Sequence, residues 1–224
     1  MIPLRDDQPS FSTPFINYFL IVLNVIVFLW ELSIGHRALA GVAYEFGVVP
    51  HKIVAALSGA PYQSATSAIL PIFTSMFLHG SFFHLAGNML YLWIFGDNVE
   101  DYLGHFSYLI FYFISGLAAA LTHILLNLNS DMPTIGASGA IAGVLGAYFI
   151  LYPKARVLTW LFIFVAWLPA WLTLGAWFLY QFTNVTAIAQ SGVAVLAHLG
   201  GFAAGAIMIK VFPERSHRYR YGTW

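Results

Sequence analysis

The sequence predicts an all-α membrane protein, a bundle of six transmembrane helices. Of its 224 residues, 60% are hydrophobic and only 8% are charged, and the mean hydropathy is +0.78. A soluble domain carries about 25% charged residues, so this composition excludes one. Six stretches come close to the roughly 20 apolar residues that a spanning helix needs; they are residues 15–32, 72–95, 106–128, 135–152, 157–182 and 193–212. We expect the whole chain, residues 1–224, to form a single membrane domain.

The first stretch is interpreted as a retained helix. Residues 1–13, which precede it, lack the Lys/Arg-rich region and small-residue cleavage site of a signal peptide. The connection over residues 33–70 is long and partly apolar, and it is expected to lie on the extracytoplasmic side. It is either an interfacial lobe with short amphipathic helices or a disordered loop.

The cationic side chains predict the orientation, because short loops rich in Lys and Arg stay cytoplasmic. Two of the nine, Arg37 and Lys52, fall on one side of the predicted helices. The others fall on the opposite side: Arg5, Lys154, Arg156, Lys210, Arg215, Arg218 and Arg220. Both termini are therefore predicted to be cytoplasmic. A compact chain with no targeting extension or appended soluble domain favours a prokaryotic plasma membrane; an organellar membrane is the alternative.

Charge and cysteine content exclude several functions. The formal net charge is +0, so no basic field is present to attract nucleic acid. The absence of cysteine rules out thiolate zinc sites, iron–sulfur clusters and cysteine nucleophiles. His79, His84 and His198 could in principle hold a metal, but no carboxylate is expected near them, and we expect neither metal nor cofactor. The oligomeric state is not indicated.

Ser138 is the candidate nucleophile. It is flanked by glycines and lies where the fourth stretch begins, so the free N–H groups and positive dipole end of a helix would be close to it. Such a position suits a developing oxyanion. The alternative is that Gly139 and Gly143 simply form a small-xxx-small packing face.

His198, in the sixth stretch, is the candidate general base, since a serine hydroxyl needs a base to become a nucleophile. Gly201 and Gly205 form a second small-xxx-small face. That face would let the sixth helix approach the Gly139/Gly143 face closely enough for a Ser–His hydrogen bond. A purely structural histidine is the alternative.

A third cluster contains His79, His84 and Asn88. His84 and Asn88 are four residues apart and share one face of a helix, so their side chains could stabilise an oxyanion together. His79 is expected to point elsewhere and to be structural. No acidic residue is placed to complete a triad, which leaves a Ser–His dyad.

Together the three motifs resemble those of the rhomboid intramembrane serine proteases. They are His-x4-His-x3-Asn at His79, His84 and Asn88, Gly-x-Ser-Gly at Gly136, Ser138 and Gly139, and Ala-His-x2-Gly-x3-Gly at Ala197, His198, Gly201 and Gly205. The resemblance implies a six-helix core with a long first outward loop. It also implies hydrolysis of peptide bonds in or near the transmembrane segments of membrane-protein substrates, which would reach the site laterally from the lipid bilayer.

The resemblance assigns a role to each matching residue. Ser138 would attack the scissile carbonyl, His198 would act as base and then acid, and Asn88, His84 and the Ser138 N–H would hold the oxyanion. Many relatives carry an aromatic residue four positions after the serine, packed against the histidine, where this chain has Ala142. The orientation of His198 is therefore left open.

The fifth stretch contains four tryptophans and a proline, which are Trp160, Trp167, Trp171, Trp177 and Pro169. By family analogy this helix is a candidate lateral gate; the plainer interpretation is a set of interfacial anchors. Two alternatives to a protease remain, a catalytically inactive rhomboid-like protein that binds transmembrane helices and a transporter or channel. Both Ser138 and His198 are retained, which argues against the first, and the expected lack of an embedded carboxylate argues against the second.

Overall fold

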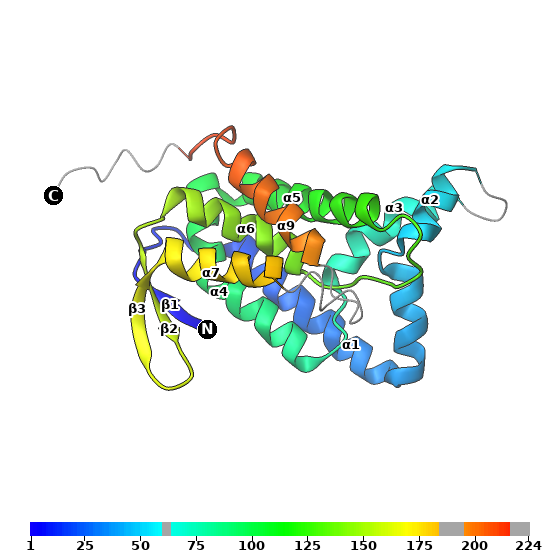
Figure 1. Cartoon of the computed structure of the whole chain (residues 1–224), viewed down its shortest axis with the longest axis horizontal. Coiled ribbons are helices and arrows are strands. Elements are labelled where there is room, and N and C mark those ends of the chain that lie inside the picture. The colour runs from blue at the N-terminus through cyan, green and yellow to red at the C-terminus, as the bar shows by residue number, and fades with distance from the viewer. Residues whose placement is uncertain (60–63, 184–194, 216–224) are drawn as a thin grey trace.

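The computed structural model describes residues 1–59, 64–183 and 195–215. The molecule is mostly helical, as predicted, and also contains a small sheet at one end of the helix bundle (Figure 1). The helices are α1 (Phe15–Phe46), α2 (Pro50–Leu57), α3 (Ala65–Thr74), α4 (Phe82–Leu103), α5 (His105–Leu126), α6 (Ser138–Leu151), α7 (Ala170–Thr183) and α9 (Val195–Met208), with a 3-10 turn, η1, at Ser75–Phe77. The strands are β1 (Ile2–Asp6), β2 (Arg156–Trp160) and β3 (Val165–Pro169).

Two described helices are long and apolar enough to cross a membrane on their own. They are Phe15–Gly35, the first part of α1, and α5. The segment Ile69–Phe77 together with α4 would be a third crossing if this bent pair is counted as one. By length and composition the described residues therefore support two or three crossings, fewer than the six predicted. The helices α6, α7 and α9 are apolar but shorter.

The connection after the first crossing is largely helical where it is described. The backbone of α1 breaks at Gly35, whose φ of 78° is readily adopted by glycine, and continues as a second helical part to Phe46. The helices α2 and α3 follow and lie at the end of the molecule opposite the sheet (Figure 1).

The predicted helix over residues 72–95 is incorrect in its first third. Residues 72–77 belong to α3 and η1, and α4 begins only at Phe82, with an 87° bend between the two segments. The polar break at His79-Gly80-Ser81 accounts for the bend, because the Ser81 side chain accepts a hydrogen bond from the His84 N–H and caps a new helix.

The predicted helix over residues 157–182 is also wrong in its first half. Residues 156–169 form the antiparallel hairpin β2–β3, and β1 pairs with β2 to give the sheet order β1-β2-β3. The segment is continuously apolar, but in β2 the buried Val157 and Thr159 alternate with more exposed residues, as in a half-buried strand. Pro169 ends β3 and is not inside a helix.

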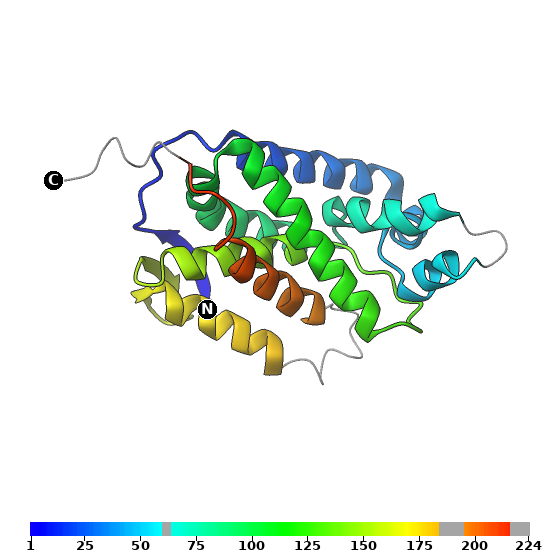
Figure 2. The ribbon, with the colours of Figure 1, turned by 90° about the horizontal axis from the view of Figure 1, so that it is seen from above.

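The centre of the bundle is formed by α5, α6 and α9, and α9 runs between α5 and α7 (Figure 2). Glycines make this packing possible. A Cβ at Gly201 would lie 2.1 Å from the Gly139 carbonyl oxygen, and one at Gly205 would lie 1.9 Å from that of Gly143. The backbones of α6 and α9 are therefore in direct contact, which only a residue without a side chain allows.

The expectation of no embedded carboxylate is wrong. Glu31 in α1 and Glu100 in α4 are both buried. Glu100 accepts hydrogen bonds from the N–H groups of Ile16 and Asn17, at 3.0 and 2.7 Å, and so caps the start of α1. Glu31 lies at the end of an apolar run, and Glu100 lies in a polar segment but has its partners 83 and 84 residues away in the sequence, so the local pattern did not reveal that either would be buried.

Candidate active site

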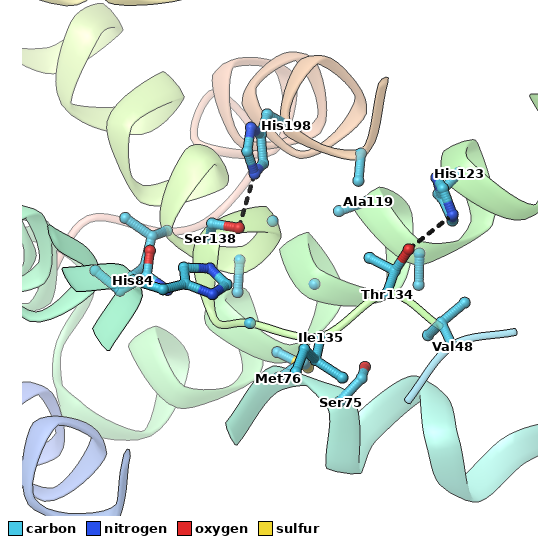
Figure 3. Close-up of a pocket in the computed structure, with 18 of the residues that line it drawn as sticks. Val48, Ser75, Met76, His84, Ala119, His123, Thr134, Ile135, Ser138 and His198 are labelled. Atoms are coloured by element: carbon cyan, nitrogen blue, oxygen red, sulfur yellow. Dashed lines mark hydrogen bonds between the residues drawn. The ribbon is translucent and has the colours of Figure 1, made fainter. Parts of the chain in front are cut away.

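A cavity of about 580 Å³ opens beside the first turn of α6. Its walls come from η1, α4, α5, α6, α7, α9 and the loop before α6, so it lies where these elements converge (Figure 3). The four residues predicted to carry out catalysis or to hold the oxyanion line it, namely His84, Asn88, Ser138 and His198. The described fold thus brings together side chains from α4, α6 and α9.

Ser138 is the first residue of α6. The turn before it contains Gly136, with φ of 126°, a conformation that glycine adopts without strain. A Cβ at Gly136 would lie 2.7 Å from the ring of His84, so a side chain would also displace that histidine. The N–H groups of the first helical turn have no partner within the helix. They begin at Ser138 itself, next to the hydroxyl.

His198 reaches Ser138 from α9. Its Nε2 lies 2.7 Å from the Ser138 Oγ (Figure 3). The close packing of α9 on α6, where Gly201 faces the Gly139 carbonyl, brings the two side chains together, because a larger residue at position 201 would separate the helices. For the hydroxyl to donate, the imidazole must be neutral with its proton on Nδ1. A hydrogen bond of this length is what a serine nucleophile and a histidine base would need.

An aromatic ring packs against His198, although Ala142 cannot supply one. Ala142 is fully buried. The indole of Trp177, on α7, lies 6.1 Å from the imidazole of His198 between ring centroids, at an interplanar angle of 35°. The same indole packs beside the rings of Tyr91 and Phe202, with ring centroids 6.2 and 6.4 Å away. Sequence spacing could not identify this partner, since it comes from a different helix.

Asn88 and His84 lie beside the same turn. Asn88 is buried, and its Nδ2 lies 2.8 Å from the Nε2 of His79. The Nδ1 of His79 lies 3.3 Å from the Phe77 carbonyl oxygen, so this nitrogen carries the proton and Nε2 accepts from the Asn88 amide. The second N–H of the Asn88 amide is then available to a ligand in the cavity.

His79 is therefore connected to the site, although the sequence predicted that it points elsewhere. Its ring meets that of His84 edge-on, with centroids 5.1 Å apart. Its backbone N–H donates to both carboxylate oxygens of Glu31, each at 3.1 Å. The bend between η1 and α4 turns the ring back toward α4, which a continuous helix would not do.

The cavity wall contains a second polar pair, which the sequence did not predict. His123 of α5 and Thr134 of the loop before α6 are hydrogen-bonded, Nε2 to Oγ1, at 2.9 Å (Figure 3). Thr134 also pairs with Val48 through backbone hydrogen bonds of 2.8 and 2.9 Å. These contacts attach the loop before Ser138 to α5 and to the segment between α1 and α2.

These features define a helical membrane protein with a hydrogen-bonded serine and histidine in an internal cavity. Residues 66–215 match the family model of the rhomboid domain. The chain is 34% identical over 195 residues to "Rhomboid protein 1, mitochondrial" of Saccharomyces cerevisiae, covering 85% of this chain and 51% of the yeast protein. The chain belongs to the rhomboid family.

Other relatives agree with this assignment. "RHOMBOID-like protein 5" of Arabidopsis thaliana is 32% identical over 142 residues, which are 60% of this chain and 41% of that protein. "Presenilin-associated rhomboid-like protein, mitochondrial" of Bos taurus is 33% identical over 89 residues, 39% of this chain and 24% of that protein. The chain thus spans about half the length of the yeast relative and less of the other two.

The comparisons overturn the predicted localisation. These relatives are eukaryotic, and two of the three are named as mitochondrial, which points away from a prokaryotic plasma membrane. That prediction, with its cytoplasmic termini, is wrong. It depended on the absence of a targeting extension and of further domains, and this absence carries no information in a chain that spans about half of its relative.

Proposed function

We propose that this chain is an intramembrane serine endopeptidase that hydrolyses peptide bonds in or near the transmembrane segments of membrane proteins. The observation that carries the proposal is the 2.7 Å contact between His198 Nε2 and Ser138 Oγ inside the cavity. Membership of the rhomboid family supports the same reaction.

In the proposed mechanism the Ser138 oxygen attacks the scissile carbonyl while its proton passes to His198 Nε2. The tetrahedral intermediate collapses when the imidazolium returns this proton to the leaving amine. Water then attacks the acyl-enzyme, again with His198 as base, and releases the second product. No cofactor takes part in these steps.

The developing oxyanion would be held by three donors beside the turn before α6. They are the Ser138 N–H, the Asn88 amide and the His84 ring. The hydrogen bond from Asn88 to His79 fixes the amide before substrate arrives, and preorganised donors are the most effective stabilisers of such charge.

We further propose the six-crossing arrangement and the single membrane domain over residues 1–224. A helix of 14 residues, such as α6, is about 21 Å long, shorter than the roughly 30 Å hydrocarbon core. If its far end reaches one surface, Ser138 lies below the other. A site at that depth suits substrates that arrive laterally from lipid, and the cavity would supply the water that the reaction needs.

A fluorophosphonate probe tests the nucleophile without knowledge of the substrate. We expect purified protein in detergent to be labelled at Ser138, located by mass spectrometry of the peptide, because the probe reacts only with an activated hydroxyl. Labelling should be lost in Ser138→Ala and His198→Ala.

Two variants serve as controls. Ser33→Ala and His51→Ala change residues that are exposed and do not line the cavity, so both proteins should label at the parent rate. Absence of labelling in a parent protein that retains its thermal transition would instead favour an inactive rhomboid-like protein that binds transmembrane helices.

A further inference from the structure

The β2–β3 hairpin takes no part in the proposed reaction. It joins the end of α6 to the start of α7 and extends sideways from the end of the helix bundle (Figure 1). One face of the hairpin is covered, because Val157 and Thr159 are buried and the Thr159 hydroxyl lies 3.4 Å from that of Thr173 on α7. The opposite face and the tip are open.

The tip is apolar and exposed. Phe162, Ile163 and Phe164 are 73%, 92% and 60% accessible. Hairpin turns in water usually take Asn, Asp or Gly, which adopt positive φ at low cost. Here Phe162 has φ of 68°, so a bulky apolar residue occupies a position where glycine would be less strained. Large side chains exposed together at a strained turn indicate an apolar environment around the tip.

The open face carries tryptophan and arginine side by side. Arg5 and Trp167 are both paired with Leu158 across the sheet, so all three share this face. The guanidinium groups of Arg5 and Arg156 lie 5.3 and 5.8 Å from the centre of the Trp167 ring. Tryptophan favours the headgroup region of a bilayer, and arginine binds phosphate through several N–H groups.

The position of the hairpin selects a lipid surface over other partners. Its first strand begins at Arg156, shortly after α6 ends at Leu151, and its second strand ends at Pro169, directly before α7, so it lies where apolar helices terminate. In a protein whose α1 and α5 can cross a bilayer, such helix ends lie near the headgroups. The exposed Lys154 adds a third cation to Arg5 and Arg156. The Arg156 guanidinium also forms an ion pair with the Asp7 carboxylate, at 2.7 Å.

We propose that the β2–β3 hairpin is a membrane-interface anchor. Phe162, Ile163 and Phe164 insert among the acyl chains, and Arg5 and Arg156 bind the phosphates of anionic lipids. This binding surface is independent of catalysis at Ser138, so its test does not depend on the proposed function.

The chain has no cysteine, so Ile163→Cys introduces a unique thiol for a nitroxide spin label. The labelled protein is reconstituted into phosphatidylcholine vesicles, and collisions are measured with oxygen, which concentrates in lipid, and with a water-soluble nickel chelate. The matched control is Lys154→Cys at the base of the hairpin. We expect the label at position 163 to collide more often with oxygen, and the label at position 154 to collide more often with the nickel chelate.

Two results would overturn the anchor. One is a label at position 163 that the nickel chelate reaches as readily as at position 154. The other is spin–spin broadening at position 163 that disappears when unlabelled protein is added, which would show that a second copy of the chain covers the tip.

The phosphate contact is tested with vesicles containing one third phosphatidylglycerol. Anionic lipid should raise the oxygen-to-nickel ratio at position 163, and the additional change Arg5→Gln should remove most of that increase. A ratio that is the same in both lipids, or an increase that Arg5→Gln leaves intact, would refute binding of anionic lipid by this face.

Discussion

At the scale of single residues, the site depends on how each polar group is held. His198 is oriented by its contact with Ser138 and by the indole of Trp177. Asn88 is held by His79, whose own backbone is held by Glu31. His198 and Asn88 therefore each have a supporting neighbour from another segment, and in the proposed mechanism preorganisation of this kind would lower the cost of stabilising the transition state.

Asn88→Ala should lower the cleavage rate by about 10²-fold, the usual effect of losing one oxyanion donor. The measurement is kcat for a single-span substrate, alongside the thermal midpoint. A loss of rate with an unchanged midpoint supports a donor role, whereas full activity in the variant would remove Asn88 from the mechanism.

Trp177→Ala should lower the rate at which Ser138 reacts about tenfold or more, because small displacements of a catalytic group have effects of up to ~10²-fold. Trp177→Phe should retain most of the activity, since it keeps a ring against His198. The fluorophosphonate labelling rates of both variants provide the measurement. Faster reaction in Trp177→Ala would instead support the interpretation of this residue as part of a lateral gate.

At the scale of elements, the geometry of the site depends on the contact between α6 and α9. Gly139, Gly143, Gly201 and Gly205 bring the two backbones together. Ser138 directly precedes Gly139, and His198 lies three residues before Gly201. Packing between these helices and the Ser–His distance are therefore set by the same residues.

Gly201→Leu should destabilise the protein by at least about 1–3 kcal/mol, the cost of overpacking, because its Cβ would lie 2.1 Å from the Gly139 carbonyl oxygen. Thermal unfolding in detergent gives the measurement. Gly175→Leu is the matched control on α7, where a Cβ would meet nothing within 4 Å. Equal midpoints for the two variants would contradict the proposed close packing.

At the scale of the whole molecule, the sheet connects the first residues of the chain to the segment after α6. Asp7 accepts hydrogen bonds from the backbone N–H and the guanidinium of Arg156, each at 2.7 Å, and this lowers the pKa of its carboxyl. Asp6 accepts a hydrogen bond from the Tyr148 hydroxyl, but burial outweighs it and raises the pKa of Asp6 to about 6 from an ordinary value of 3.8.

The raised pKa of Asp6 predicts a pH dependence of stability. The folded protein binds this proton more tightly than the unfolded chain, so the contribution is complete below pH ~4 and is lost as the pH rises through about 6. Asp6→Asn mimics the protonated acid. Its thermal midpoint relative to the parent should therefore be higher at pH 7 than at pH 4; a difference that does not change with pH would contradict the assignment.

The sequence predicted much of the helical content and four polar residues of the cavity wall, which are His84, Asn88, Ser138 and His198. Gly136 and Ser138 belong to one short motif and His198 belongs to another, and each motif is recognisable in the sequence by itself. The hairpin was missed because an apolar run that contains Trp160 and Trp167 satisfies the composition of a membrane helix, and only strand pairing with residues 2–6 distinguishes the two. Such pairing joins segments about 150 residues apart.

Contacts between distant segments explain the other differences. Glu31 ends an apolar run, and its partner, the N–H of His79, is 48 residues away. The ring beside His198 comes from Trp177 on α7, and no spacing rule relates it to Ala142. Such partners are fixed by packing of the bundle, which a local pattern does not contain.

The most direct test of the proposed reaction is cleavage of a single-span membrane protein by the purified chain, beside Ser138→Ala and His198→Ala, followed by gel and mass spectrometry. We predict a product cut in or near the transmembrane segment that appears only with the parent protein, while both variants keep its thermal midpoint. The same product formed by folded Ser138→Ala would contradict catalysis by this serine.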